Sequence, residues 1–336
     1  MLDFERDLDQ LRSRIAELEA DSDVDSASDV LRQLELMQLE LEARTADVFS
    51  RLTPWQRVQL ARHRDRPHTL DFIERMIEGF VELHGDRRHG DDMAVVGGVG
   101  SLQGRRVVVV GHQKGRDTRQ NVERNFGMAH PEGYRKAIRL FKLAARFGLP
   151  VITLLDTPGA GPALEDEERG QSWAIAESMA VMARLETPIV VAVVGEGGSG
   201  GALAMGVGDR ILMLEHAIYS VASPEAAAAI IWRDSKFAER AAEALGLTSD
   251  VLYAADLIDR IVPEPSGGAH RDYDATAENL KAALVEALDE LQAMAPADLV
   301  AARYAKFRAM SAHVESTPDV AAVDGASVVS ENRHGL

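Results

Sequence analysis

The chain has 336 residues, of which 46% are hydrophobic, 27% charged and only 5% aromatic. This length allows one large domain or two smaller ones, with a sizeable core. The absence of cysteine excludes disulfides, thiolate nucleophiles, iron–sulfur clusters and cysteine-ligated zinc. The 54 acidic and 37 basic side chains give a net charge of −17, which argues against nucleic acid as a main partner, because nucleic-acid binding relies on a basic face.

The N-terminus has neither the basic start nor the apolar run of a signal peptide. The longest apolar segments, Pro188–Val194 and Ala226–Trp232, are much shorter than a membrane span. No two histidines show the spacing of metal ligands. We therefore expect a cytoplasmic protein with no membrane partner and no metal of its own.

Residues 1–65 are predicted to form a helical extension. An apolar stripe at helical spacing marks the first helix, at Leu8, Leu11, Ile15 and Leu18. After a polar break at residues 21–29, leucines resume the pattern from Leu31 toward Phe49. Two antiparallel helices that pack on each other, or on a partner chain, fit this pattern.

Residues 66–312 are predicted to form an α/β domain, because buried strands alternate with helices. The expected strands are a hairpin at 94–99 and 106–111, then Val151–Leu155, Ile189–Val194, Arg210–Leu214 and Leu257–Val262. The expected helices are Tyr134–Phe147, Glu167–Leu185, Glu225–Trp232, Ser235–Leu245, Asp250–Leu257 and Tyr273–Ala309. Residues 313–336 are small and polar, and we expect a disordered tail there.

A glycine-rich turn, Gly195–Ala202, connects the strand that ends at Val194 to a short helix that begins near Ser199. Glycine lets a ligand approach the backbone closely, and the free amides of a helix start favour negative charge. The turn therefore predicts a site for a phosphate or an oxyanion. The structural alternative is a tight turn that only packs helix on strand.

A dinucleotide fingerprint is one possible interpretation of the turn. Gly195, Gly197 and Gly200 have the G-x-G-x-x-G spacing, and Glu215 lies about twenty residues on, as a ribose-binding acid would. However, the segment before the next strand is too short for the crossover helix that this fold requires.

Two catalytic interpretations remain. Ser199 lies in a G-x-S-x-G pattern typical of a serine hydrolase, with Asp256 or Asp259 and then His270 in the order of a triad. Alternatively, the Gly200–Gly201 amides alone hold an enolate or tetrahedral oxyanion. A second turn, Asp156–Pro162, also follows a buried strand, so the two turns are predicted to line one cleft at the same sheet edge.

Several motifs occur in one order and together resemble the α subunits of bacterial acetyl-CoA carboxylase carboxyltransferases. They are Gly111–Arg116, Asn125–Met128, Pro131–Ala137, Asp156–Ala160, Glu168–Ser172, Gly195–Ala202, Glu264-Pro265 and Gly267–Arg271. The resemblance extends from the N-terminal helices to about residue 310. It implies a crotonase-like fold, a spiral of ββα units, with the N-terminal helical hairpin and C-terminal helices added.

The resemblance also implies a reaction and its partners. A carboxyl group moves from carboxybiotin, on a separate biotin carboxyl carrier protein, to acetyl-CoA, which gives malonyl-CoA for fatty-acid synthesis. A β subunit with a cysteine-rich zinc ribbon joins α in an α2β2 assembly, so zinc is expected only there. ATP is consumed by another subunit, biotin carboxylase, and this chain has neither a phosphate loop nor a biotinylation signal.

Site residues follow from the same resemblance. The amides of Gly200 and Gly201 match the pair that stabilises the biotin oxyanion, and no side chain of this subunit is a covalent catalyst. The carboxybiotin side is expected to include Gly197, Gly198, Ser199, Pro158, Gly159 and Ala160. Lys114 and Arg116, in a basic run, are candidate anion contacts, with a solvated loop as the alternative.

One loop departs from the family pattern. Gly161 and Ala163 stand where the family usually has tyrosine and glycine, in the run Gly-Ala-Tyr-Pro-Gly. This loop is expected to border the cleft. A non-catalytic scaffold that assembles other chains through its terminal helices is the alternative from a different class, but it would not need the glycine turns.

Overall fold

A computed structural model describes residues 2–20 and 27–310, and the expected tail at 313–336 lies outside this range. The helices are α1 (Arg6–Ala20), α2 (Ala27–Ser50), α3 (Pro54–Ala61), α4 (Thr69–Met76), α5 (Thr118–Glu123), α6 (Pro131–Phe147), α7 (Leu164–Glu168), α8 (Gln171–Ala183), α9 (Ser199–Leu203), α10 (Pro224–Trp232), α11 (Ala238–Leu245), α12 (Ser249–Ala254), α13 (Tyr273–Gln292) and α14 (Pro296–Ala309). The strands are β1 (Glu78–Glu82), β2 (Val95–Leu102), β3 (Arg105–His112), β4 (Val151–Thr157), β5 (Ile189–Gly198), β6 (Arg210–Leu214), β7 (Ile218–Ser220) and β8 (Arg260–Val262).

The strands form one sheet in the order β1-β2-β3-β4-β5-β6-β8, and β7 pairs with the end of β5. The predicted hairpin is confirmed: β2 and β3 pair antiparallel through a turn at Gln103-Gly104, where both residues have positive φ. From β3 to β8 the pairing is parallel. The ends of β3, β4 and β5 therefore meet at one edge of the sheet.

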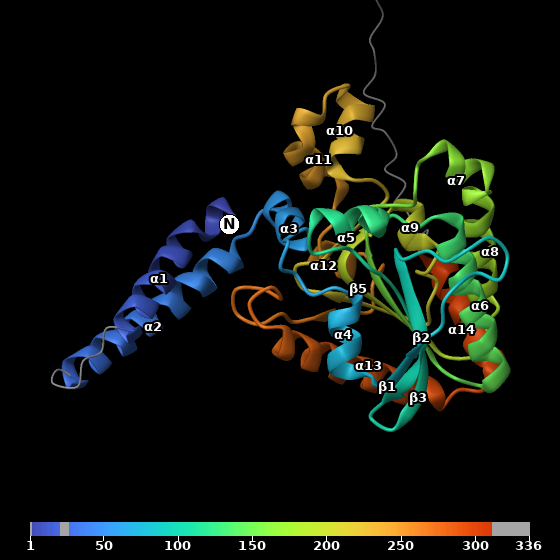
Figure 1. Cartoon of the computed structure of the whole chain (residues 1–336), viewed down its shortest axis with the longest axis horizontal. Coiled ribbons are helices and arrows are strands. Elements are labelled where there is room, and N and C mark those ends of the chain that lie inside the picture. The colour runs from blue at the N-terminus through green and yellow to red at the C-terminus, as the bar shows by residue number, and fades with distance from the viewer. Residues whose placement is uncertain (1, 21–26, 311–336) are drawn as a thin grey trace, which may run out of the picture.

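Helices cover both faces of the sheet, as the continuous apolar strands predict. β4 and β5 are buried at every position. On one face α6 packs on β2 and β3 and against α8, and α13 contacts β5, β6 and β8 on the other (Figure 1). The central core is made mainly of valine, leucine, alanine and isoleucine from these layers.

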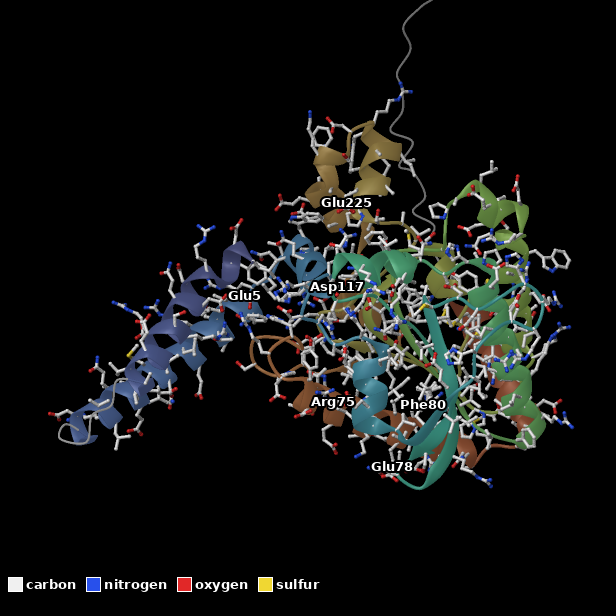
Figure 2. All side chains as sticks on the ribbon, in the orientation of Figure 1. Glu5, Arg75, Glu78, Phe80, Asp117 and Glu225 are labelled. Atoms are coloured by element: carbon white, nitrogen blue, oxygen red, sulfur yellow. The ribbon has the colours of Figure 1, made fainter. Side chains whose placement is uncertain are left out.

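The N-terminal hairpin projects from the body as a long rod of α1 and α2 (Figure 1). Glu5 lies where this rod meets the body (Figure 2), and it binds His270 at 3.2 Å and Arg271 at 2.9 Å. The polar break predicted at 21–29 falls mostly outside the described residues. α3 leaves the rod and packs Val58 and Ala61 against α11 and β7.

Two long helices predicted from the sequence are each broken in the structure. Gly170, with φ of +83°, separates α7 from α8, where one helix was expected over 167–185. The predicted helix 273–309 ends at Gln292, and α14 begins again at Pro296, because proline fits the first turn of a helix but not its interior. The two short strands β1 and β7 were not expected at all.

Among the described residues, no helix combines the length and apolarity that crossing a membrane requires.

Candidate functional site

The glycine-rich segment occupies the end of β5 and the start of α9. The expectation that the strand ends at Val194 was wrong, because Glu196, Gly197 and Gly198 continue it by pairing with β7. The helix begins at Ser199, as predicted, with Gly198 as its N-cap. Ser199 has φ of +51°, a left-handed conformation that is uncommon outside glycine and that turns the chain from strand into helix.

The two predicted turns lie against each other. Thr157, at the end of β4, pairs with Gly197 in β5. A Cβ on Gly198 would lie 2.2 Å from the Pro158 carbonyl oxygen, and one on Gly201 would lie 2.6 Å from the Gly159 carbonyl carbon. Only glycine permits this backbone approach. Pro158, Gly197 and Gly198 also line one small hollow, so both turns border it.

Gly200 and Gly201 differ in their surroundings. Gly201 is buried, whereas Gly200 is half-buried, and a Cβ on it would meet only Ile175, at 3.4 Å. Both belong to the first turn of α9, whose amides have no carbonyl partner within a helix. The backbone at this point can therefore donate hydrogen bonds to an outside acceptor.

A buried ionic cluster lies directly beneath the glycine-rich segment. Lys114 Nζ lies 2.7 Å from both Asp156 Oδ1 and Glu196 Oε2. Arg62 Nε donates to the other oxygen of Glu196 at 2.6 Å, and His68 Nδ1 lies 2.9 Å from Asp156 Oδ2. The Glu196 amide donates to Asp156 at 3.1 Å, which ties the ends of β4 and β5 together. We refer to these five residues as the paired cluster.

Charges in the paired cluster stabilise one another. Burial alone would raise the pKa of both Asp156 and Glu196, but the Lys114 ammonium holds both below their usual values, helped by His68 at Asp156 and by Arg62 at Glu196. Burial would lower the pKa of Lys114, and the two carboxylates raise it instead. Lys114, Asp156 and Glu196 therefore stay charged across the neutral range.

Arg62 extends the paired cluster to a neighbouring lobe. Its guanidinium also donates to Glu225 at 2.6 Å. Glu225 belongs to α10, which with α11 forms a lobe beside the body (Figures 1 and 2). The half-buried Arg62 side chain thus connects this lobe to Glu196, the residue that precedes Gly197.

The basic run predicted as an anion contact is largely occupied within the chain. Arg116 donates to the carbonyls of Arg64 and Arg66 and pairs with Asp71. Lys114 is held in the paired cluster, and its side chain is only 14% exposed. The anion role of these two cations stays a prediction, and their present partners are acceptors that an anion would have to displace.

His112, in the same run, is fully buried at the end of β3. Burial lowers its pKa to about 3, and the nearby Asp156 carboxylate opposes this shift only in part, so the ring is neutral. Neither ring nitrogen meets hydrogen-bond geometry with any partner among the described residues.

Gly161, one of the two residues that depart from the family pattern, lies in a buried part of its loop. A Cβ on Gly161 would lie 2.4 Å from Asp166 Oδ2, and the Gly161 amide donates to the Ala129 carbonyl at 2.9 Å. A side chain at position 161 would therefore have to displace the Asp166 carboxylate, which lies 2.6 Å from His130 Nδ1. Ala163 is exposed and is the N-cap of α7.

Known proteins resemble this chain over nearly its whole length. The family model described as acetyl co-enzyme A carboxylase carboxyltransferase-like matches residues 1–311. The acetyl-coenzyme A carboxylase carboxyl transferase subunit alpha of Thermus thermophilus is 52% identical, over 94% of this chain and 99% of its own. The corresponding subunit of Thiobacillus denitrificans is 50% identical, over 94% and 98%.

This chain belongs to that carboxyltransferase family. It is a transferase, and its reaction class is carboxyl transfer in acetyl-CoA carboxylase. The resemblance drawn from its motifs is therefore confirmed.

Solved structures identify the fold of this carboxyltransferase subunit. Transcarboxylase 12S matches with a TM-score of 0.56 at 18% identity, over 68% of this chain and 42% of that one. A Pseudomonas malonate decarboxylase hetero-tetramer in complex with coenzyme A matches with a TM-score of 0.54 at 20% identity, over 66% and 90%. At such identities the likeness concerns the fold alone, and it confirms the expected crotonase-like architecture.

The serine hydrolase alternative is not supported. His270 binds Glu5 at the base of the N-terminal rod, and Asp259 accepts from the Ile211 amide and pairs with Lys306. The triad candidates are thus engaged elsewhere, and the family comparisons point to carboxyl transfer. The dinucleotide interpretation is not supported either. The helix that follows the turn, α9, has only five residues and is too short to be the crossover helix of a dinucleotide-binding fold.

Proposed function

We propose that this carboxyltransferase subunit carries the carboxybiotin side of an active site shared with a β subunit. The observation that carries the proposal is the Gly200–Gly201 pair, in the first turn of α9 and packed on the 158–160 loop. The substrates are carboxybiotin, held by a separate carrier protein, and acetyl-CoA. The product is malonyl-CoA for fatty-acid synthesis.

The Gly200 and Gly201 amides are proposed to donate to the ureido oxygen of biotin as its carboxyl group leaves. Negative charge develops on that oxygen, so preorganised donors stabilise the transition state more than the ground state. Gly197, Gly198, Ser199 and the 158–160 loop shape the surface on which the biotin ring lies. The geometry supports this because the two turns are in contact and Gly200 is reachable from outside.

Residues of the paired cluster hold these donors in place. Lys114, Asp156 and Glu196 touch neither substrate in this proposal, and they fix the ends of β4 and β5 from below. Lys114 and Glu196 are therefore positioning residues. The anion contact predicted from the sequence for Lys114 is therefore not part of this proposal, and such a contact is proposed for Arg116 alone.

A β subunit is implied by the naming of the family's relatives as subunit alpha. We propose that it holds the acetyl-CoA enolate on a glycine pair of its own, carries the zinc, and forms an α2β2 assembly with this chain. The carrier protein and the ATP-consuming biotin carboxylase are the other proposed partners, and the cytoplasmic location stays a prediction.

The test is the reverse reaction, with malonyl-CoA and a biotin analogue, in the chain co-expressed with its β subunit. Turnover should require both chains. Gly201→Val should lower turnover about a hundredfold or more, because its side chain displaces Gly159 and Ala160 and with them the donors. Assembly and melting temperature are measured on the same sample, so that misfolding is recognised.

Ser199→Ala is the matched control, because Ser199 is the next residue in the same segment and its hydroxyl has no role in the proposal. It should assemble normally and keep most of the turnover. A side chain at Gly200 should also block the approach of biotin, so Gly200→Ala is not a neutral variant. Activity of this chain alone, or a loss in Ser199→Ala as large as in Gly201→Val, would contradict the proposal.

A further inference from the structure

A strongly basic hollow lies between helix α6 and the loop that joins β1 to β2. Its volume is about 270 Å³. The residues that line it, here called the basic hollow, are Asp86, Arg87, Arg88, Arg135, Ile138, Arg139, Lys142 and Glu177. Five cations thus face two carboxylates, in a chain whose net charge is −17. Such a local reversal of charge concentrates anions.

The arginines come from two segments that are distant in sequence. Arg135, Arg139 and Lys142 are spaced by four and three residues, so they share one face of α6. Arg87 and Arg88 come from the loop, which Arg139 holds in place by donating to the carbonyls of residues 83, 84 and 85 at 2.8, 3.1 and 3.0 Å. The hollow is therefore built by the fold.

Asp86 gives the loop its shape. One of its carboxylate oxygens accepts the amides of Arg88, His89 and Gly90 at 2.8 to 3.0 Å. These bonds lower the pKa of Asp86 against the effect of burial, and the charge of Arg135 adds to them. The carboxylate is thus committed to the loop backbone and to a cation already present.

Three of the arginines form no ion pair with a carboxylate among the described residues. Within residues 2–20 and 27–310, no ion pair joins Arg87, Arg88 or Arg139 to a carboxylate. Arg87 donates to the His84 carbonyl at 2.7 Å, and Arg139 donates only to carbonyls, which satisfy hydrogen bonds but leave the charge. Burial and then the charge of Arg87 lower the pKa of Arg139, and the nearby Asp91 and Asp86 carboxylates oppose this shift only in part.

The other two cations are only loosely neutralised. Arg135 Nη1 lies 3.5 Å from Glu132 and its Nε has no hydrogen-bond partner among the described residues, while Lys142 lies 3.6 Å from Glu177. Grouping like charges in a part-buried hollow costs stability unless an anion offsets the repulsion.

We propose that the basic hollow binds the phosphate groups of a small ligand, as a diphosphate or a phosphomonoester. Guanidinium groups match phosphate oxygens in pairs, and such charge-assisted bonds are strong. The volume accommodates one or two phosphate groups rather than a whole nucleotide. The phosphates come either from a free phosphate compound or from the diphosphate of coenzyme A, and the recognition chemistry is the same. The inference does not depend on the roles proposed for Gly200 and Gly201.

The experiment is titration calorimetry of the assembled α and β chains with inorganic pyrophosphate at physiological chloride. Wild type should bind, and Arg87→Gln should weaken binding about tenfold because it removes one charge-assisted contact. Arg88→Gln provides a second, exposed position in case Arg87→Gln fails to fold. Arg119→Gln is the matched control, since Arg119 is 87% exposed, lies outside the hollow and should bind like wild type.

A titration with coenzyme A distinguishes the two possible sources of the phosphate groups. If Arg87→Gln also weakens coenzyme A binding about tenfold, the hollow takes the diphosphate of the substrate. If coenzyme A binding is unchanged while pyrophosphate binding falls, the ligand is a separate phosphate compound. No pyrophosphate binding by wild type, or equal weakening in Arg119→Gln, would overturn the proposal.

Discussion

The paired cluster and the basic hollow use the same kinds of charged residue in opposite ways. In the paired cluster, Lys114 lies within 2.7 Å of two buried carboxylates, and Arg62 and His68 complete the pairing. In the basic hollow, Arg87 and Arg139 donate to backbone carbonyls and keep their charge. Charges that pair internally hold a backbone in position, whereas charges left unpaired are available to a ligand. The predictions below separate these two uses.

Loss of Lys114 should have the largest effect. Lys114→Met leaves Asp156 and Glu196 buried and without their shared cation, which typically costs about 3–5 kcal/mol. We expect a large fall in the free energy of unfolding, measured with urea, and a fall in kcat larger than any rise in KM, since neither substrate touches Lys114.

Lys142→Met is the matched control from the basic hollow. Lys142 is 60% exposed, and its ion pair with Glu177 is 3.6 Å long, so its loss should change stability by less than about 0.5 kcal/mol. Equal destabilisation in the two variants would remove the distinction between the two regions.

A second internally paired group, Glu264, should contribute stability that acid removes, and this effect should be smaller than that of Lys114→Met. Its carboxylate binds Arg66 at 2.6 and 3.2 Å, and Arg66 also donates to the Val194 carbonyl in β5. Burial would raise the pKa of Glu264, but Arg66 lowers it from 4.5 to about 2. A lowered pKa gives stability that is complete above pH 4.5 and is lost as the pH falls toward 2. This lowering of the pKa corresponds to about 3 kcal/mol of the free energy of unfolding.

The measurement compares wild type with Glu264→Gln in urea at pH 6 and at pH 3. The variant lacks this titration, so the gap in unfolding free energy between the two proteins should narrow as the pH falls. A gap that stays constant would show that Glu264 does not keep its charge through Arg66. Glu286→Gln serves as the control, because its pair with Arg260 is exposed on both sides and its loss should not alter the pH dependence.

Sequence patterns predicted most of the central sheet and the meeting of the two turns. The apolar runs at 151–155 and 189–194 are long enough to identify buried parallel strands, and parallel strands bring the turns that follow them to one edge. Strand β1 escaped detection because its residues are mostly exposed and show no apolar alternation. The extension of β5 to Gly198 depends on pairing with β7, a contact that local sequence does not reveal.

The candidate site was predicted only in part. The glycines were visible because their spacing is unusual, and Asp156, Lys114 and Glu196 lay within or beside the motifs. Arg62 and His68 were missed, because they precede α4 in a run that reads as ordinary surface charge. Their roles arise from long-range contacts, 134 and 88 residues apart along the chain. The basic hollow is likewise invisible in the sequence, since Arg87 and Arg139 are brought together only by the fold.

The smallest effect is expected in the basic hollow itself. Arg87→Gln removes an exposed cation that repels Arg139 and has no carboxylate partner among the described residues. The free energy of unfolding in chloride should therefore change by less than about 0.5 kcal/mol, and we expect a small increase. Arg87→Lys keeps the charge and should keep the repulsion. Adding pyrophosphate should then raise the melting temperature of wild type and of Arg87→Lys more than that of Arg87→Gln, because a ligand that binds only the folded state stabilises it by mass action. If Arg87→Gln instead destabilises the protein as strongly as Lys114→Met, the arginine is a structural residue like those of the paired cluster, and the opposite uses of charge in the two regions would not hold.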